Sequence, residues 1–261
     1  MSEGKVVIVT GGTYGIGRGI TLLLASRGCR VVAFGLDEKQ PGSAAEEGSV
    51  GIRAELERQG FNADVVLADV SKASEVRKVV DLAIGKYGRI DGLVNNAAIR
   101  PYGTVLDTSE ETWDRVMDVN IKGMFLTTKA VLPYMIEQGG GAIVNIASGS
   151  GWGKPNRIAY CASKGAVFAF SAALAYDHVH DRIRVNTVVP GFTASGMTEG
   201  REEGRTLGGN NVAGRGVLPE DIAKTVAYLL SDDAEVVSGA VITVGCFLGQ
   251  GGPIPKPVGK K

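Results

Sequence analysis

A tyrosine and a lysine four residues apart are the first candidates for chemistry in this chain. Tyr160 and Lys164 lie in the stretch AYCASKG, and residues at positions i and i+4 of a helix share one face. A free phenol has a pKa of about 10 and is a poor base at neutral pH, but a nearby ammonium group stabilises the phenolate and lowers that pKa. Such a tyrosine can exchange a proton with a substrate hydroxyl. The spacing alone fits an ordinary amphipathic helix better, so other signals must decide.

A glycine-rich loop follows the first apolar run of the chain. KVVIVT leads into TGGTYGIG, which has glycines at positions 11, 12, 15 and 17. Gly11 and Gly12 permit a tight turn, Gly15 lets the backbone approach a phosphate, and Gly17 lets the next helix pack on the sheet. The N-terminus of that helix would direct its N–H groups at a pyrophosphate. Because the motif follows a strand and opens a helix, it predicts dinucleotide binding rather than a plain strand–helix turn.

Strands and helices alternate along the whole chain. Short apolar runs predict buried strands at 5–9, 30–34, 63–67, 90–94, 141–146, 183–188 and 239–244. Helical patterns lie between them, at about 15–27, 49–59, 74–87, 110–137, 158–178 and 219–230. Buried strands that alternate with helices predict an α/β fold, a doubly wound parallel sheet of seven strands with helices on both faces. We expect one dinucleotide-binding catalytic domain over residues 1–261.

Three segments depart from this alternation. Residues 35–48 are polar, carry Gly and Pro, and are longer than a usual strand–helix connection. Residues 192–216 are polar and Gly-rich, and predict either a substrate loop over the site or an ordinary surface loop. The C-terminal tail, residues 249–261, is rich in Gly, Pro and Lys, so we expect it to fray or to dock on a partner subunit.

Composition excludes several classes of function. The 28 Lys and Arg residues balance 28 Asp and Glu residues, which gives no electrostatic case for binding nucleic acid or an acidic membrane. No apolar run approaches the ~20 residues of a membrane helix, and the N-terminus has no signal-peptide pattern. The three cysteines, Cys29, Cys161 and Cys246, form no CxxC pair, which fits a reducing compartment. The sequence therefore predicts a cytoplasmic protein.

Two histidines are the only candidates for a metal site. His178 and His180 lie two residues apart, which places them on different faces of a helix. We expect them to form the polar end of that helix, and we expect no metal in catalysis.

Several further motifs follow the glycine loop in order. They are ADV with Asp69 and Val70, NNAA with Asn96 and Ala97, MDVNIKGMF with Asn120, IVNIASGSG with Ser148, YCASK, and VNTVVPGFTASGM. With TGGTYGIG, they resemble the short-chain dehydrogenase/reductase family over essentially the whole chain. Ala98 replaces the glycine usual in the family's N-N-A-G motif, and VGCFLGQGG stands where many members have V-D-G-G.

The resemblance implies an NAD(P)-dependent oxidoreductase that interconverts a secondary alcohol and a ketone, or a sugar hemiacetal and a lactone. It implies that Tyr160 is the general acid/base and that Lys164 lowers the pKa of Tyr160 and binds the nicotinamide ribose. Ser148 would hydrogen-bond the substrate oxygen, with Ser150 as its rival, and Asn120 would hold a water that links Lys164 to bulk solvent. We favour Ser148 because it follows the strand directly. The implied cofactor contacts are Gly11, Thr13, Tyr14, Gly15, Ile16, Gly17, Asp69, Val70, Asn96, Ala97, Tyr160, Lys164, Pro190, Gly191 and Thr193.

The end of the second strand bears on the choice between NAD and NADP. An acidic side chain there accepts hydrogen bonds from the adenosine ribose, whereas an arginine accommodates the 2′-phosphate of NADP. The position that is most often acidic in the family is Gly35, and the position where an arginine often marks NADP is Leu36. Asp37 follows, and no basic residue directly precedes Gly15. These features favour NAD, with Asp37 as a cofactor contact; the alternative for Asp37 is a solvated loop carboxylate.

Two arginines suggest a substrate class. Arg100 follows the fourth predicted strand, and Arg157 lies three residues before Tyr160. Our hypothesis is that they bind an anionic or polyhydroxylated substrate (a sugar, sugar acid, sulfosugar or hydroxy acid), with Lys154 as a further candidate, because an arginine fork suits a carboxylate, sulfonate or phosphate. Trp152 would stack on a sugar ring or cover the site. The alternative is that both arginines are solvated and Trp152 fills the wall.

Other functions remain open from the sequence. One is a 3-oxoacyl or ketone reductase that uses NADPH, another is a non-catalytic dinucleotide-binding protein, and a third is a structural or interaction role. The family resemblance implies a homodimer or homotetramer, of which we favour the homotetramer, with the helices near 110–137 and 158–178 packed on their mates. We expect a small-molecule substrate and no nucleic acid or membrane partner.

Overall fold

Seven parallel strands form one sheet at the centre of the protein. The computed structural model describes residues 4–36, 51–193 and 212–245, and the strands follow the order β3-β2-β1-β4-β5-β6-β7. Their bounds are β1 Val6–Thr10, β2 Arg30–Gly35, β3 Ala63–Leu67, β4 Gly92–Asn95, β5 Gly141–Ile146, β6 Ile183–Pro190 and β7 Val241–Val244. The predicted doubly wound seven-stranded sheet is confirmed. β4 and β7 each begin two residues later than expected, at Gly92 and Val241.

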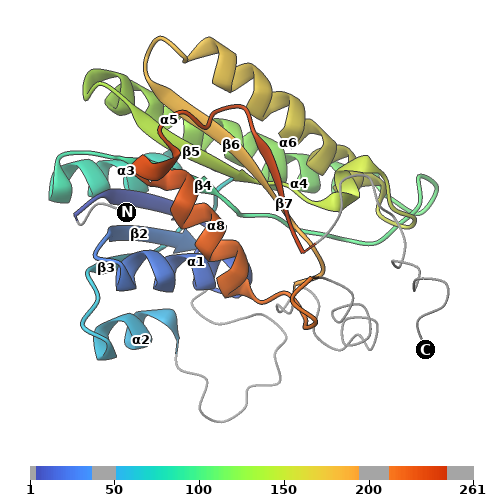
Figure 1. Ribbon diagram of the computed structural model, residues 1–261. Coiled ribbons are helices and arrows are strands. Elements are labelled where there is room, and N and C mark those ends of the chain that lie inside the picture. Colours follow the sequence, from blue (N-terminus) through green and yellow to red (C-terminus); the bar gives the residue numbers. More distant parts are fainter. Residues whose placement is uncertain (1–3, 37–50, 194–211, 246–261) are drawn as a thin grey trace.

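Helices cover both faces of the sheet, as Figure 1 shows. α1 (Gly15–Ser26), α2 (Ile52–Arg58) and α8 (Pro219–Leu230) pack on one face. α3 (Ala73–Tyr87), α5 (Gly123–Glu137) and α6 (Ile158–Asp177) pack on the other. Alternate residues of β1 divide between these two cores: Val7 and Val9 face α1 and α8, and Ile8 faces α3 and α5. Side chains buried on both sides explain why the strands read as continuous apolar runs.

The helix expected over 110–137 is interrupted. α4 (Glu110–Met117) passes into a π-helical turn, η1 (Asp118–Lys122), before α5 begins at Gly123. A π-turn inserts an extra residue into the helix and rotates the side chains that it carries. Asn120 lies on this turn and is buried, and its side chain hydrogen-bonds both the N–H and the carbonyl of Ile99 as well as the Ser163 hydroxyl. Local periodicity could not predict the interruption, because these partners are distant in sequence.

The strand order creates a switch point at the carboxyl ends of β1 and β4. The chain runs outward from β1 through β2 to β3, and then returns so that β4 pairs with the other side of β1. Ligands of doubly wound sheets bind at such a point, outside the carboxyl ends of the strands. The glycine loop follows β1 there, and the NNAA motif follows β4.

α6 is a core helix, although its length and composition would suffice to cross a membrane. This helix corrects the expectation that no apolar run approaches membrane length. Its buried side chains include Tyr160, Ser163 and Lys164, and Leu174 packs in the core with β5 and β6 residues. Packing against the sheet accounts for the buried part of α6, which is 39% of its most apolar 18-residue window.

Candidate active site

The glycine loop leaves the N-terminus of α1 open to a ligand. Gly11 and Gly15 have φ values of 59° and 58°, which favour glycine. A Cβ on Gly17 would lie 1.9 Å from the Gly11 carbonyl oxygen, so no side chain fits there. Tyr14 precedes the helix without a side-chain capping bond, and the first turn holds no acidic residue. The first N–H groups of α1 thus have no side-chain cap, as a phosphate site requires.

The residues that follow β4 hold the glycine loop in place through hydrogen bonds. The Thr10 hydroxyl accepts hydrogen bonds from the N–H groups of Asn96 and Ala97. The Asn96 amide in turn donates to the carbonyls of Thr10 and Gly11, at 3.1 and 3.0 Å. Asn96, expected as a cofactor contact, therefore holds the shape of the loop through its side chain.

Thr13 supplies a test of whether the site fits a dinucleotide. Its side-chain oxygen is buried and has no hydrogen-bond partner among the residues that the structure describes. A Cβ on Gly35 would approach that oxygen to 2.7 Å, so the glycine at the end of β2 makes room for Thr13. A buried hydroxyl without a hydrogen-bond partner destabilises the fold, and a ligand that hydrogen-bonds to it removes this penalty. Three features together fit a bound dinucleotide: the unsatisfied Thr13 hydroxyl, the glycine loop after β1 and the N-terminus of α1 without a side-chain cap.

We expect Thr13→Val to weaken cofactor binding about 5- to 20-fold, which corresponds to one lost hydrogen bond. The same change should leave the melting temperature unchanged or slightly higher, because it removes a buried polar atom that has no partner in the free protein. Isothermal titration with NAD and thermal unfolding without NAD measure the two effects. Ser26→Ala is the matched control, since the exposed Ser26 hydroxyl lies at the opposite end of α1. Unchanged NAD affinity in Thr13→Val would contradict the assignment.

Asp69 lies after β3 and is held by two groups that the sequence did not single out. Its carboxylate accepts hydrogen bonds from the N–H and hydroxyl of Ser71 and from the Arg115 guanidinium on α4. Burial raises the pKa of Asp69, but these hydrogen bonds and the Arg115 charge outweigh burial and hold that pKa below its usual range. The carboxylate is therefore charged and fixed in orientation.

Tyr160, Lys164 and Ser148 come together at the carboxyl end of β5. Tyr160 is 7% exposed, and the Ser148 side chain lies close enough to its phenol to act on the pKa of Tyr160. Lys164 Nζ lies 5.9 Å from the centre of the Tyr160 ring and donates to the Ile146 carbonyl at 2.7 Å. Burial lowers the pKa of Lys164 to about 8. The predicted one-turn spacing thus places both side chains in one buried site.

The charges that act on Tyr160 differ from those that the spacing predicted. Burial raises the pKa of Tyr160, and it outweighs the hydrogen bond from Ser148 and the charges of Arg100 and Arg157, all of which lower it. The leading favourable charges are thus the two arginines rather than Lys164. The Lys164 ammonium instead donates a hydrogen bond to the Ile146 carbonyl.

The turn after β5, η2 (Gly149–Trp152), separates the two candidate serines. Ser148 caps this turn and makes the contact with Tyr160, whereas the Ser150 N–H donates to the Ser148 hydroxyl at 3.1 Å. A Cβ on Gly151 would lie 2.8 Å from the Lys164 carbonyl oxygen, so glycine lets the turn pack directly on α6. Trp152 stacks on Phe168 of α6 with ring centres 4.7 Å apart, and it is 40% exposed.

Arg100 and Arg157 meet over one aromatic ring. Their guanidinium carbons lie 5.7 and 5.3 Å from the centre of the Tyr102 ring. The segments that carry them pair through an isolated bridge between Gly103 and Arg157. Sequence reasoning missed Tyr102; its position two residues after Arg100 was the available signal.

The remaining cofactor candidates also lie at the carboxyl edge of the sheet. Pro190 ends β6, the Gly191 N–H donates to the Val244 carbonyl, and Thr193 pairs with Val217. Val70 is buried after β3, and Ile16 packs against the core from α1. Asp37, most of the 35–48 loop and 192–216 segment, and the whole 249–261 tail lie outside the described residues.

The two histidines lie at the end of α6. His178 follows the last residue of the helix, and its Nδ1 lies 2.8 Å from an Asp181 carboxylate oxygen. Within the described ranges, no three His, Cys, Asp or Glu side chains gather in a group that could hold a metal ion.

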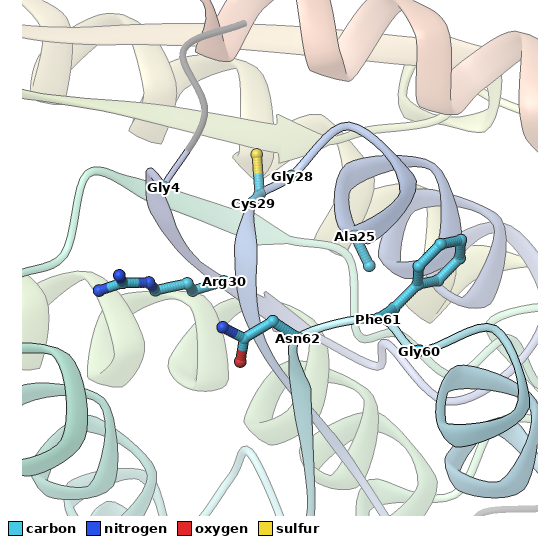
Figure 2. Close-up of a pocket in the computed structure, with 8 residues that line it drawn as sticks. All are labelled: Gly4, Ala25, Gly28, Cys29, Arg30, Gly60, Phe61 and Asn62. Atoms are coloured by element: carbon cyan, nitrogen blue, oxygen red, sulfur yellow. The ribbon is translucent and has the colours of Figure 1, made fainter.

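A separate cavity lies at the opposite edge of the sheet. Figure 2 shows that it opens at the amino ends of β1, β2 and β3, and its volume is about 310 Å³. Its lining residues are Gly4, Ala25, Gly28, Cys29, Arg30, Gly60, Phe61 and Asn62. None of the candidate site residues contributes to this cavity.

The fold and the site define an oxidoreductase of the dinucleotide-binding class. A glycine loop lies at the switch point, and the Ser148, Tyr160 and Lys164 side chains gather at the end of β5, an arrangement that fits a dinucleotide beside a candidate acid/base. Comparison with known proteins gives the family. Residues 5–206 match the family model described as short chain dehydrogenase. The chain belongs to the short-chain dehydrogenase/reductase family and is an NAD(P)-dependent oxidoreductase.

Named relatives span almost the full length of this chain. A 3-oxoacyl-[acyl-carrier-protein] reductase FabG of Thermotoga maritima is 38% identical over 93% of this chain and 96% of its own. A cyclopentanol dehydrogenase of a Comamonas species is 38% identical over 92% of this chain and 95% of its own. A solved structure from Burkholderia xenovorans, described as belonging to the same family, has a TM-score of 0.82 at 31% identity and covers 93% of this chain and 95% of its own.

Proposed function

We propose that this protein is an NAD-preferring dehydrogenase of an anionic or polyhydroxylated secondary alcohol, with Tyr160 as its general acid/base. The observation that carries the proposal is the buried contact between Tyr160 and Ser148, with Lys164 beside it. The names of two relatives support a reaction at a secondary alcohol or ketone, since cyclopentanol is the former and a 3-oxoacyl group contains the latter.

In the oxidative direction, Tyr160 takes the proton of the substrate hydroxyl as the carbonyl group forms. Ser148 donates a hydrogen bond to the same oxygen and stabilises its developing charge. A nicotinamide cofactor bound beside these residues would supply the hydride chemistry at the carbinol carbon. Lys164 binds the nicotinamide ribose, and Asn120 holds a water that passes the proton of Tyr160 toward solvent. Single residues thus supply proton transfer and orientation, and the cofactor supplies the hydride chemistry.

Two positions support NAD over NADP. Tyr14 stands directly before Gly15, and Leu36 follows β2. Neither Tyr14 nor Leu36 offers the guanidinium that a 2′-phosphate would require. A 3-oxoacyl or ketone reductase that uses NADPH is the second candidate, because a relative of that name is 38% identical.

The arginine pair supports an anionic substrate. Both guanidinium groups act on Tyr160 electrostatically, so a group that they bind lies close to the acid/base. Guanidinium groups bind carboxylate, sulfonate and phosphate through paired hydrogen bonds. We also propose that the enzyme acts in the cytoplasm as a homodimer or homotetramer, with the exposed Trp113 of α4 and Phe125 of α5 at the interface.

Arg100→Met and Arg157→Met should each raise KM for an anionic substrate about 10- to 100-fold, because a charge-assisted hydrogen bond contributes about 1.5–3 kcal/mol. Nicotinamide absorbance measures turnover with NAD and separately with NADP. The substrates are matched pairs: 3-hydroxybutanoate with 2-butanol, and a sugar acid with its neutral sugar.

Arg27→Met is the control variant, because Arg27 is exposed at the far end of α1. Turnover of the neutral members alone, with unchanged kinetics in both arginine variants, would contradict the anionic substrate class. It would leave the dehydrogenase assignment intact. Faster turnover with NADP than with NAD would favour the second candidate.

A further inference from the structure

Tyr102 connects the two arginines, and we infer that Tyr102 is the positioning residue that makes Arg100 and Arg157 one binding site for the carboxylate, sulfonate or phosphate group of the substrate. The inference rests on the proposed anionic substrate and adds a residue that neither the motifs nor the reaction requires. The two guanidinium carbons lie 5.7 and 5.3 Å from the centre of the Tyr102 ring.

Backbone pairing fixes this arrangement between two distant segments. The Gly103 N–H donates to the Asn156 carbonyl, and the Ile158 N–H donates to the Gly103 carbonyl, both at 3.1 Å. A Cβ on Gly103 would lie 2.7 Å from the Thr108 hydroxyl oxygen, so a side chain at this position would force Thr108 to move. The Tyr102 ring is thereby held beside Arg157, which is the residue that opens α6.

On the other side, Arg100 is tied to the catalytic face of the fold. Its neighbour Ile99 is held at both its N–H and its carbonyl by Asn120, which also bonds Ser163 on α6. Both ends of the arginine pair are therefore anchored to the helix that carries Tyr160. These contacts fix the backbone on which Arg100 and Arg157 stand relative to α6.

The ring contributes to the site electrostatically. Two guanidinium groups near one ring repel each other, and the negative face of the ring offsets part of that repulsion. Stacking uses the face of a guanidinium and leaves hydrogen bonding to its edge. The Arg157 Nε is buried and has no hydrogen-bond acceptor among the described residues. An anion at this point would give Arg157 a hydrogen-bond acceptor.

Exposure places the ring where a substrate can reach it. Tyr102 is 44% exposed, whereas Tyr160 is 7% exposed. Because the Tyr102 ring is half-exposed, its removal should not unfold the protein. The charges of both arginines nevertheless act on Tyr160, so an anion on the pair lies within reach of the acid/base.

The test compares Tyr102→Phe with Tyr102→Leu. Phe keeps the ring and loses only the hydroxyl, whereas Leu removes the ring at similar bulk. Isothermal titration with malonate in the presence of NAD measures anion binding directly. We expect Phe to bind malonate within threefold of the natural protein and Leu to bind it at least tenfold more weakly. KM for 3-hydroxybutanoate should follow the same order, while kcat and the turnover of 2-butanol stay within twofold.

A double variant provides the second measurement. If the ring acts through the arginines, Tyr102→Leu should weaken malonate binding far less in an Arg100→Met background than in the natural protein. Equal malonate affinity in the natural protein and Tyr102→Leu, or fully additive effects, would overturn the inference. Absence of any dehydrogenase turnover with intact malonate binding would instead overturn the proposed function and leave the anion site standing. Turnover of 2-butanol without malonate binding would overturn the anion site alone.

Discussion

Tyr160→Phe should lower kcat about 10²- to 10⁴-fold, the usual contribution of a general acid/base. The variant removes one oxygen from a ring that is 7% exposed, so the packing of α6 against β5 should persist. NAD affinity should change less than threefold, because the phenol is needed for proton transfer rather than to hold the cofactor. Absorbance at the nicotinamide band and calorimetric NAD titration measure the two quantities.

A matched control lies on the same helix. Tyr176→Phe makes the same chemical change on α6 at a side chain that is 82% exposed, and it should leave kcat within twofold. Full activity of Tyr160→Phe would contradict the role of Tyr160 and would favour a non-catalytic dinucleotide-binding protein. Loss of NAD affinity together with activity would show instead that Tyr160 mainly shapes the cofactor site.

Lys164→Met should abolish most activity and yet leave the protein no less stable at pH 7. Burial lowers the pKa of Lys164 from 10.5 to about 8, so the charged form is disfavoured in the folded state. The difference corresponds to a destabilisation of roughly 3 kcal/mol at neutral pH. Loss of the hydrogen bond to the Ile146 carbonyl offsets about 1–2 kcal/mol of the gain. The free energy of unfolding should therefore be equal or slightly higher in the variant.

The destabilisation caused by burying the charged Lys164 depends on pH. Below about pH 8 the folded and unfolded states both carry the Lys164 proton, so the full penalty is present. Between about pH 8 and 10.5 the folded state loses the proton first, so the contribution of Lys164 to stability rises with pH. Urea unfolding of both proteins at pH 7 and pH 10 measures this effect. The free energy of unfolding of Lys164→Met, relative to that of the natural protein, should be lower at pH 10 than at pH 7.

Lys129→Met is the control for this comparison, because it makes the same chemical change at an exposed lysine on α5. A large loss of stability in Lys164→Met at pH 7 would mean that Lys164 mainly supports the fold. Activity above a tenth of the natural rate would remove Lys164 from the proposed catalytic group.

The arrangement of strands and helices was largely readable from the sequence. Each strand is buried on both faces, so its apolar run is continuous, and each helix shows its own period. The glycine loop and the Tyr160–Lys164 spacing were readable for the same reason: a turn and a helical face are set by neighbours a few residues away. The π-turn at Asn120 was missed, since its cause is hydrogen bonding to Ile99 and Ser163.

Long-range packing decided what the sequence left open at the site. The sequence allowed Arg100 and Arg157 to be either substrate-binding or solvated. Only contacts between distant segments, such as that of Gly103 with Arg157, bring both to the Tyr102 ring. Likewise, the choice of Ser148 over Ser150 at Tyr160 and the low pKa of Lys164 depend on how η2 and α6 cover each other. Residue types and local spacing determined the fold and the class of chemistry. Desolvation and contacts between distant segments, which local spacing does not encode, decided the charges around Tyr160.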